Sequence, residues 1–171
     1  HCLDWHRTAD LVAFGSHHTV LLARGVATEE AEVTQVLSGH KSEIVTVSWL
    51  YPETGGTLLA TCSIDGFVLI WHQNDGEGWV RQCSLPGAHK GGACLDSRVH
   101  LGTLYLATVC SVVGTINLYA LSAASQEWSL LCSRPPTNAQ LLPLSLSLVS
   151  ICLLFRKLQS RFNHFQKQAT R

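Results

Sequence analysis

Methionine is absent from all 171 residues, and the first residue is His1 rather than an initiator methionine. We therefore expect the sequence to be a fragment of a longer protein. Charged residues are scarce as well, at 14% against 46% hydrophobic residues. A chain with this length and apolar content is expected to fold as one domain of ordinary size around a buried core.

The cysteine pattern also lacks the signs of disulfide bonds or metal sites. The seven cysteines are an odd number, none stands in a Cys-x-x-Cys spacing, and there is no Asn-x-Ser/Thr sequon. This favours a reducing, intracellular setting over secretion. Cys62, Cys83, Cys94 and Cys110 fall in apolar runs typical of strands, where a thiol packs as a small hydrophobic group. We expect buried packing residues rather than redox groups or metal ligands.

The common motifs of nucleotide and metal enzymes do not occur. There is no P-loop, no Gly-x-Gly-x-x-Gly and no His-Glu-x-x-His. The pair His17 and His18, together with His6 or His1, would suggest a metal site. Neighbouring residues of a strand point to opposite faces, however, so they cannot easily bind one ion. We expect an exposed histidine pair at the start of a strand, and no metal or other cofactor.

Acidic residues are confined to one part of the chain. Residues 1–133 contain six Lys/Arg and all twelve Asp/Glu, a net charge of −6, whereas residues 134–171 contain six Lys/Arg and no acid. The two parts are therefore expected to be separate regions. An acidic region is a poor electrostatic match for RNA, so we expect protein partners and no direct binding to nucleic acid.

Residues 1–133 do contain a repeated pattern of short runs rich in Val, Ile, Thr and aromatic residues, which favours strands. The middle unit has the runs IVTVSWL, TLLATCS, FVLIW and WVRQCSL, separated by turns such as YPETGG and IDG. The same order precedes it, from CLDWH to AEVTQVL, and follows it, from ACLDSRV to EWSLLC. Trp5 and Trp49 lie 44 residues apart, and His40 and His89 lie 49 apart. Four-stranded units with this period predict the blades of a β-propeller.

The middle unit resembles a WD40 repeat in three stretches: Gly39-His40, LLATCSIDG and FVLIW. In WD40 blades a loop histidine, a hydroxyl of the second strand, an Asp of the following turn and a Trp of the third strand form a hydrogen-bonded tetrad. The resemblance implies a structural tetrad of His40, Thr61, Asp65 and Trp71. The expected fold class is therefore all-β, a partial WD40 propeller of about three four-stranded blades with an irregular or helical C-terminal tail.

The outer units depart from this pattern. In the third unit Tyr119 takes the tryptophan place and His89 the histidine place, but Val113 stands where the turn Asp would be. We expect its tetrad to be broken. The first unit has no loop histidine before Trp5. The five tryptophans lie in predicted strands, and we expect them in core or inter-blade packing rather than in base stacking.

The middle unit also contains the residue types of a hydrolase triad. Thr61 or Ser63 can be combined with His40 and Asp65 into such a set. A serine nucleophile needs an exposed elbow such as Gly-x-Ser-x-Gly and an oxyanion hole, and neither is visible in the sequence. The positions match a network that satisfies polar groups within a sheet, so we expect a structural role and no enzyme activity.

Residues 1–133 are similar to the N-terminal part of the Elongator complex subunit 2 family, a double WD40 propeller. The resemblance is carried by LDW, LVAFGSHHTVLLA, LSGHKSEIVTVSWL and LLATCSIDGFVLIW. It implies an interaction scaffold, cytoplasmic and also nuclear, in a multiprotein complex that modifies wobble uridines of tRNA, with the active site on another subunit. The alternatives are another intracellular WD40 adaptor, such as a cytosolic iron–sulfur assembly protein, and a tail-anchored WD adaptor.

The tail, residues 134–171, has no charge from Pro135 to Phe155 and is basic from Arg156 onward. A membrane span is conceivable with a basic cytosolic flank. Pro143 and several polar residues interrupt the run, however, and its most apolar part is only about 15 residues, which is short for a span. An altered or mistranslated end, a divergent tail and a tail anchor remain open, with membrane association the least favoured.

Overall fold

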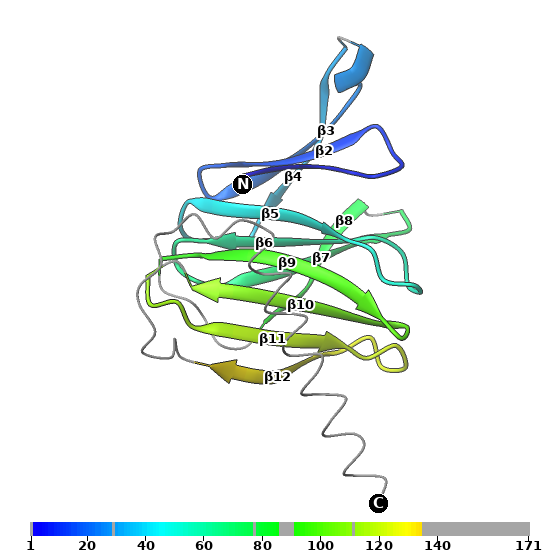
Figure 1. Ribbon diagram of the computed structural model, residues 1–171. Coiled ribbons are helices and arrows are strands. Elements are labelled where there is room, and N and C mark those ends of the chain that lie inside the picture. Colours follow the sequence, from blue (N-terminus) through cyan, green and yellow to red (C-terminus); the bar gives the residue numbers. More distant parts are fainter. Residues whose placement is uncertain (1, 29, 77, 86–90, 111, 135–171) are drawn as a thin grey trace, which may run out of the picture. The chain divides into compact units, whose positions relative to one another are not determined.

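The computed structural model describes residues 2–28, 30–76, 78–85, 91–110 and 112–134. Within these ranges the chain forms twelve strands and one short 3-10 helix, η1 (Val26–Thr28). The strands make three four-stranded sheets, in each of which the strands lie side by side in chain order (Figure 1). Every neighbouring pair is antiparallel.

We call these sheets blades. Blade 1 contains β1 (Leu3–Trp5), β2 (Leu11–Ser16), β3 (Thr19–Arg24) and β4 (Glu32–Ser38). Blade 2 contains β5 (Ile44–Leu50), β6 (Leu58–Ser63), β7 (Val68–Asn74) and β8 (Gly78–Ser84). Blade 3 contains β9 (Ala93–His100), β10 (Thr103–Cys110), β11 (Ile116–Leu121) and β12 (Trp128–Arg134). The all-β class and the three four-stranded units expected from the sequence are confirmed.

The blades repeat one another residue by residue. An alanine occupies the same place in the second strand of each blade: Ala13, Ala60 and Ala107. Their partners on the third strand are Leu22, Ile70 and Leu118. Directly after each partner the third strand shifts register against the fourth, as a β-bulge does. The recurrence of pairing and bulge shows that the three units share one backbone plan.

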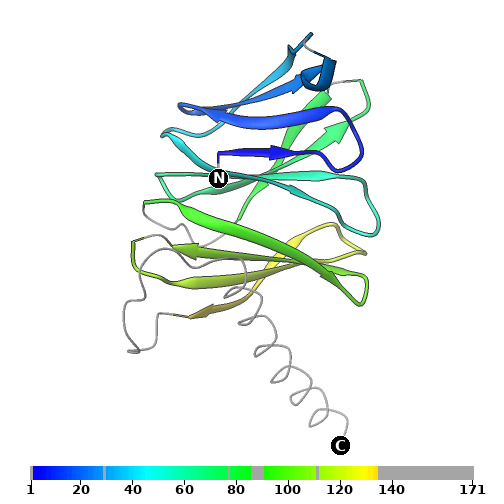
Figure 2. The ribbon, with the colours of Figure 1, turned by 45° about the horizontal axis from the view of Figure 1, so that its top comes forward.

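Blade 2 lies between the other two blades, and each of its faces contributes to a hydrophobic core (Figure 2). The first core joins blade 1 to blade 2 through Leu11, Ala13, Val20, Leu22, Leu37, Ile44, Val47, Trp49, Leu59, Leu69, Trp71 and Trp79. The second joins blade 2 to blade 3 through Leu50, Leu58, Ala60, Cys62, Val68, Ile70, Leu85, Ala93, Leu104, Leu106, Tyr119 and Leu121. All six residues of β6 are buried because this strand is covered on both faces.

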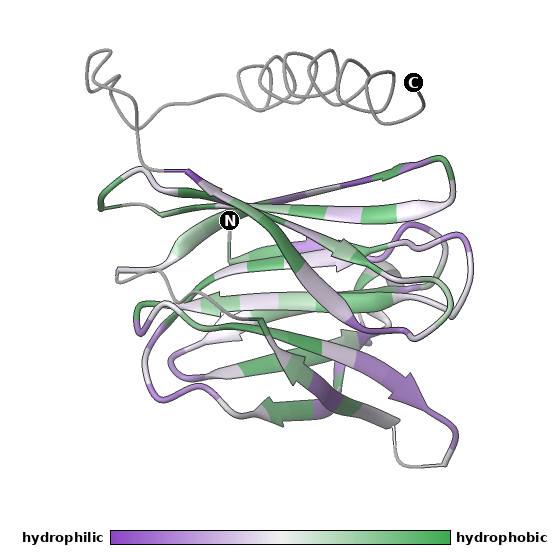
Figure 3. Cartoon of the chain, turned by 90° about the horizontal axis from the view of Figure 1, so that it is seen from below, coloured by the Kyte–Doolittle hydropathy of each residue, from purple (hydrophilic) through white to green (hydrophobic). Residues whose placement is uncertain are grey.

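Hydropathy follows this arrangement. Figure 3 shows hydrophobic segments concentrated in the strands, with hydrophilic residues in several of the connecting loops. Burial of apolar side chains between sheets supplies the main favourable free energy for such a fold. Each blade therefore depends on a neighbour to cover its faces.

Polar side chains also join successive blades, at about the repeat distance. The Trp49 backbone N–H donates to Asp4 Oδ2 at 2.8 Å, and its indole N–H donates to the Asp4 carbonyl at 3.0 Å. Gln35 contacts both backbone groups of Trp79: its Nε2 donates to the carbonyl and its Oε1 accepts the N–H, each at 2.8 Å. Asp4 and Trp49 are 45 residues apart, and Gln35 and Trp79 are 44 apart, so these hydrogen bonds join one repeat to the next.

Two burial expectations are wrong for particular residues. Trp5 is 48% exposed, although Trp49, at the equivalent place in blade 2, is 3% exposed. Trp5 lies on the face of blade 1 that points away from blade 2, where none of the described strands covers it. Cys94 is exposed because it alternates with Ala93, which takes the side of β9 that faces the second core. Cys62 and Cys110 are buried as expected.

The three blades belong to one compact unit, His1–Thr137. The tail proposed from the sequence, residues 134–171, lies outside the described residues apart from Arg134 at the end of β12. In the described ranges no helix has the length and apolar character needed to cross a bilayer.

Candidate functional site

The polar residues singled out in the middle unit surround one hydroxyl inside blade 2. His40 lies between β4 and β5 and is 7% exposed, and its Nε2 is 2.8 Å from Thr61 Oγ1. Trp71 on β7 donates its indole N–H to the same oxygen at 2.9 Å. Thr61 itself has no exposed surface. One buried hydroxyl thus joins a loop to two strands.

The pairing of β6 with β7 explains why these groups meet. Thr61 lies opposite Leu69, and Leu59 lies opposite Trp71, so Thr61 and Trp71 are diagonal neighbours on the same face. That face turns toward blade 1, whose connection to blade 2 carries His40. An indole N–H can only donate, whereas a hydroxyl can both donate and accept. Thr61 can therefore satisfy Trp71 and His40 together.

Asp65 is placed differently from the other three predicted residues. It lies in the turn after β6, where its Oδ2 accepts the Lys41 backbone N–H at 3.2 Å and its Oδ1 accepts the Phe67 N–H at 3.0 Å. His40 Nδ1 is buried and meets no hydrogen-bonding atom of the described residues. The structure thus joins His40, Thr61 and Trp71 directly, and it ties Asp65 to the residue that follows His40.

Burial and charge set the protonation of the two titratable members. Burial lowers the pKa of the His40 imidazole, and the nearby Asp65 carboxylate opposes this only in part. Burial raises the pKa of the Asp65 carboxyl, but hydrogen bonds from Ser63, Phe67 and Lys41 outweigh it and leave that pKa below its usual value. At neutral pH the site therefore holds a neutral imidazole beside a carboxylate.

Gly39 has a steric reason to precede His40. A Cβ at this position would lie 3.2 Å from both Leu69 Cδ1 and Trp71 Cη2, closer than ordinary van der Waals contact. The absence of a side chain lets the loop lie against the indole while His40 turns inward. The Gly-His pair of the sequence is thus explained by packing on Trp71.

Blade 3 contains a polar group where the sequence predicted none. Tyr119 takes the place of Trp71, as expected, and Val113 is an exposed turn residue. Asn117 Nδ2 donates to the Tyr119 hydroxyl at 3.1 Å, and the Thr108 side chain also bonds that hydroxyl. All three residues are buried. A phenol can accept as well as donate a hydrogen bond, so Tyr119 can bond both side chains within its own sheet. Asn117 stands at the place that Leu69 has in blade 2, and this polar residue was the available clue in the sequence.

The hydrolase interpretation does not fit this geometry. Thr61 and Ser63 have no exposed surface. The Thr61 oxygen is engaged by His40 and Trp71, and Ser63 Oγ accepts the Asp65 backbone N–H at 3.3 Å. A nucleophile has to reach its substrate, and neither hydroxyl is accessible.

The other histidine and cysteine candidates remain separate. His17 and His18 are exposed in the turn between β2 and β3, beside a shallow hollow lined also by Lys41, Ser42 and Glu43. In the described part of the chain no three His, Cys, Asp or Glu side chains gather as a metal site requires. Burial raises the pKa of the Cys62 thiol to about 12, which suits a packing residue and not a reactive thiolate.

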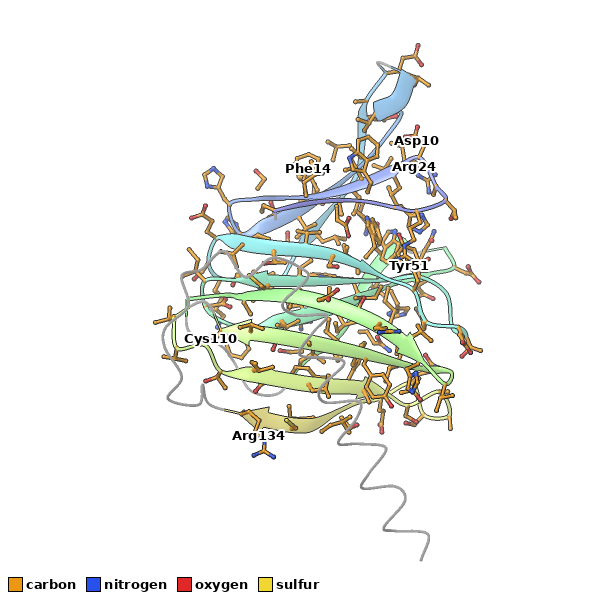
Figure 4. The ribbon with its side chains drawn as sticks, in the orientation of Figure 1. Asp10, Phe14, Arg24, Tyr51, Cys110 and Arg134 are labelled. Carbon is orange, nitrogen blue, oxygen red and sulfur yellow. The ribbon has the colours of Figure 1, made fainter. Side chains whose placement is uncertain are left out.

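A second polar cluster, which the sequence analysis missed, joins blades 1 and 2 at the ends of β1 and β5. His6 Nδ1 accepts the Ala9 N–H at 3.0 Å, and its Nε2 is 3.2 Å from Thr57 Oγ1. The Arg7 guanidinium stacks over the Tyr51 ring, 4.5 Å from its centroid, and the Arg7 backbone N–H donates to the Tyr51 hydroxyl. Tyr51 is labelled in Figure 4. Arg7 and Tyr51 are 44 residues apart, so the repeat spacing is the clue that could have paired them.

Comparison with solved structures gives this architecture a name. The crystal structure of Saccharomyces cerevisiae Sqt1, a WD-repeat protein, superposes with a TM-score of 0.60 at 17% identity, over 77% of this chain and 34% of Sqt1. The fold is a partial WD40 propeller. No protein-family model matches the chain. At this identity the likeness establishes the fold and leaves the function to other arguments.

Sequence comparison gives WD40 relatives of two kinds. Elongator complex protein 2 of Danio rerio is 27% identical over 131 residues, covering 73% of this chain and 15% of that protein. Protein transport protein SEC13 of Lodderomyces elongisporus is 39% identical over 63 residues, covering 37% and 20%. SEC13 of Cryptococcus neoformans is 32% identical over 104 residues, covering 60% and 29%. The chain thus spans less than a third of each of these relatives.

Proposed function

We propose that this partial WD40 propeller is a protein-interaction scaffold of an Elongator-type complex, the subunit 2 part of an assembly that modifies tRNA wobble uridines. The observation that carries the proposal is the length of the Elongator match. An alignment of 131 residues exceeds two repeats of about 44 residues, so it follows the repeat order and not one blade alone.

The described structure supports a scaffold role. His40 and Thr61, which resemble part of a catalytic set, are buried within blade 2, and the Thr61 hydroxyl is hydrogen-bonded to His40 and Trp71. Residues 1–133 carry a net charge of −6, which is unfavourable for direct contact with RNA. Protein subunits are therefore the proposed partners, the connection to tRNA runs through them, and the site requires no cofactor. The proposed location is the cytoplasm and the nucleus.

The rival proposal is an adaptor of the SEC13 type, in protein transport. It is favoured by higher identities, 39% over 63 residues with one SEC13 and 32% over 104 residues with another. The 63-residue match is shorter than two repeats, and the 104-residue match exceeds two repeats but covers 60% of this chain, against 73% for the Elongator match. The WD40 pattern common to many proteins is concentrated in a single blade. Local identity of this kind supports the shared fold more than a shared partner.

Affinity purification of the tagged full chain from cells, with quantitative mass spectrometry, separates the two. We expect enrichment of Elongator subunits over an untagged control. Thr61→Val is the matched variant that weakens blade 2, and it should reduce that recovery in proportion to the folded fraction measured by circular dichroism. Recovery of protein-transport proteins or iron–sulfur assembly factors without Elongator subunits would overturn the Elongator proposal.

A further inference from the structure

The loop between β1 and β2, residues 6–10, is built around the imidazole of its first residue, and we call it the His6 loop. The His6 backbone N–H donates to the Leu11 carbonyl at 2.8 Å and so closes the base of the loop. Inside the loop, the Thr8 and Ala9 backbone N–H groups both donate to His6 Nδ1, at 3.3 and 3.0 Å. One ring nitrogen is thus the acceptor for two amides, a role that only an unprotonated nitrogen can fill.

The same imidazole ties the His6 loop to blade 2, whose β5–β6 turn lies beside it (Figure 1). Because Nδ1 accepts two N–H donors, the ring proton is on Nε2, which lies 3.2 Å from Thr57 Oγ1. The ring also makes edge contacts with two aromatic rings, its centroid lying 5.1 Å from that of Trp49 and 5.5 Å from that of Tyr51. Both nitrogens of a neutral ring are therefore engaged, one within the loop and one with blade 2.

The surroundings of His6 favour this neutral ring. The titratable side chains on the elements that pack around it are those of β1, of the loop and of the segment after β5: Asp4, Arg7, Asp10, Tyr51 and Glu53. The Asp4 and Asp10 carboxylates are bonded to backbone N–H groups of other residues, and Glu53 is exposed. Burial lowers the pKa of the His6 imidazole below its usual 6.5, and none of the described carboxylates offsets this. The folded chain therefore holds His6 uncharged near pH 7.

We propose that His6 is an acid-sensitive latch, which holds the His6 loop on blade 2 while its ring is neutral and releases the loop when the ring is protonated. An imidazolium carries a proton on both nitrogens and has no acceptor. Protonation at Nδ1 thus leaves the Thr8 and Ala9 amides without their partner, and it places a second positive charge beside Arg7. All these contacts lie within blade 1 or between blades 1 and 2, so the latch depends neither on other parts of the protein nor on which complex the scaffold serves.

The direction of the effect follows from linkage. In the released loop the His6 ring is open to water and regains its ordinary pKa, so the released state binds the proton more readily than the latched state. The latch is therefore fully closed above pH 6.5 and opens as the pH falls through the lower pKa of the latched state. Opening increases about tenfold for each unit that separates the two pKa values.

Amide hydrogen exchange of the full chain, followed by NMR from pH 7.5 to 5, tests the proposal. Exchange is expressed relative to that of an unstructured peptide at the same pH. We expect the protection of the Thr8 and Ala9 amides to fall with the same midpoint as the titration of the His6 ring, read from its own carbon-bound protons. Protection that persists to pH 5, or that follows the titration of His40 instead, would overturn the latch.

Matched histidine variants assign the effect to one ring. His6→Gln carries an amide that stays neutral at every pH, so the protection of the Thr8 and Ala9 amides should become independent of pH. His18→Gln makes the same change at an exposed histidine of the β2–β3 turn and should keep the wild-type response. A wild-type response in His6→Gln would contradict the proposal. If that variant fails to fold, the agreement of the two midpoints in the wild type decides.

Discussion

Trp71 and His40 share the hydroxyl of Thr61: the indole N–H donates to its oxygen at 2.9 Å, and the imidazole Nε2 lies 2.8 Å from it. The loop before blade 2 is thereby bonded to β6 and β7 through three buried side chains. Buried polar groups that lose their only partner are costly, so the stability of blade 2 should depend on this one oxygen.

Thr61→Val keeps the shape of the side chain and removes the hydroxyl. It leaves the Trp71 N–H and the His40 Nε2 without their bond, and we expect a loss of about 2–4 kcal/mol in the free energy of unfolding. Urea unfolding provides the measurement, and Thr8→Val, at an exposed threonine, provides the control with little change. Equal losses in the two variants would show that the shared hydroxyl does not stabilise the blade.

Asp65→Ala should cost about 1–3 kcal/mol, because the Lys41 and Phe67 amides lose their acceptor. Asp65→Asn, which keeps one side-chain acceptor, should cost less. His40→Ala should be coupled to Asp65→Ala, so that the double variant loses less than the sum of the single losses. A double-mutant cycle from equilibrium unfolding measures this coupling, and strictly additive losses would place the two residues in independent interactions.

The free energy of unfolding should decrease as the pH is lowered through the range where His40 titrates. Its pKa in the folded state is below the usual 6.5, mainly because of burial. The unfolded chain then binds the proton more readily, so this contribution is fully present above pH 6.5 and is lost as pH falls through the lower folded-state pKa. Unfolding measured from pH 7.5 to 5 should show a smaller slope in His40→Gln. An NMR titration that placed the His40 pKa above 6.5 would reverse the sign.

Gly15 and Gly39 should tolerate alanine to different degrees. A Cβ at Gly15 would collide with the Cys2 sulfur and would lie 2.7 Å from Ile44 Cβ, whereas at Gly39 the nearest atoms are 3.2 Å away. Overpacking of this kind costs about 1–3 kcal/mol, and we expect Gly15→Ala to be the more destabilising. Thermal melts of the two variants rank them, with Ser38→Ala at an exposed neighbour as control. The opposite ranking would contradict the close approach of blades 1 and 2 at Gly15.

Tyr119→Phe tests the polar group of blade 3. The variant removes the hydroxyl that accepts the Asn117 amide and contacts Thr108, so it should cost about 1–3 kcal/mol. Tyr105→Phe makes the same chemical change on the opposite face of the β10–β11 pair, where the residue is partly exposed, and should cost little. The unfolding midpoints of the two variants measure this difference. Equal midpoints would show that the hydrogen bonds of Tyr119 do not stabilise blade 3.

Local sequence was sufficient for the strands and their repetition. Runs of β-branched and aromatic residues between turn residues predict strands because alternate side chains fill a half-buried sheet. The grouping of His40, Thr61 and Trp71 was implied by the resemblance of the middle unit to a WD40 repeat, and the structure brings these three side chains together. The resemblance placed Asp65 in the same tetrad, but its carboxylate bonds the backbone of Lys41, an arrangement that depends on the path of the loop.

What the sequence by itself determined is the content of each blade, because hydrogen bonding and side-chain alternation in a meander act between residues close in the chain. Only the tertiary structure decided which faces are covered. Trp5 and Trp49 occupy the same place in their blades, yet one is 48% and the other 3% exposed. The Gln35 bonds to Trp79 and the exclusion of a side chain at Gly15 likewise depend on the neighbouring blade. The burial of these side chains depends on how two sheets pack against each other, so the sequence of a single strand does not determine it.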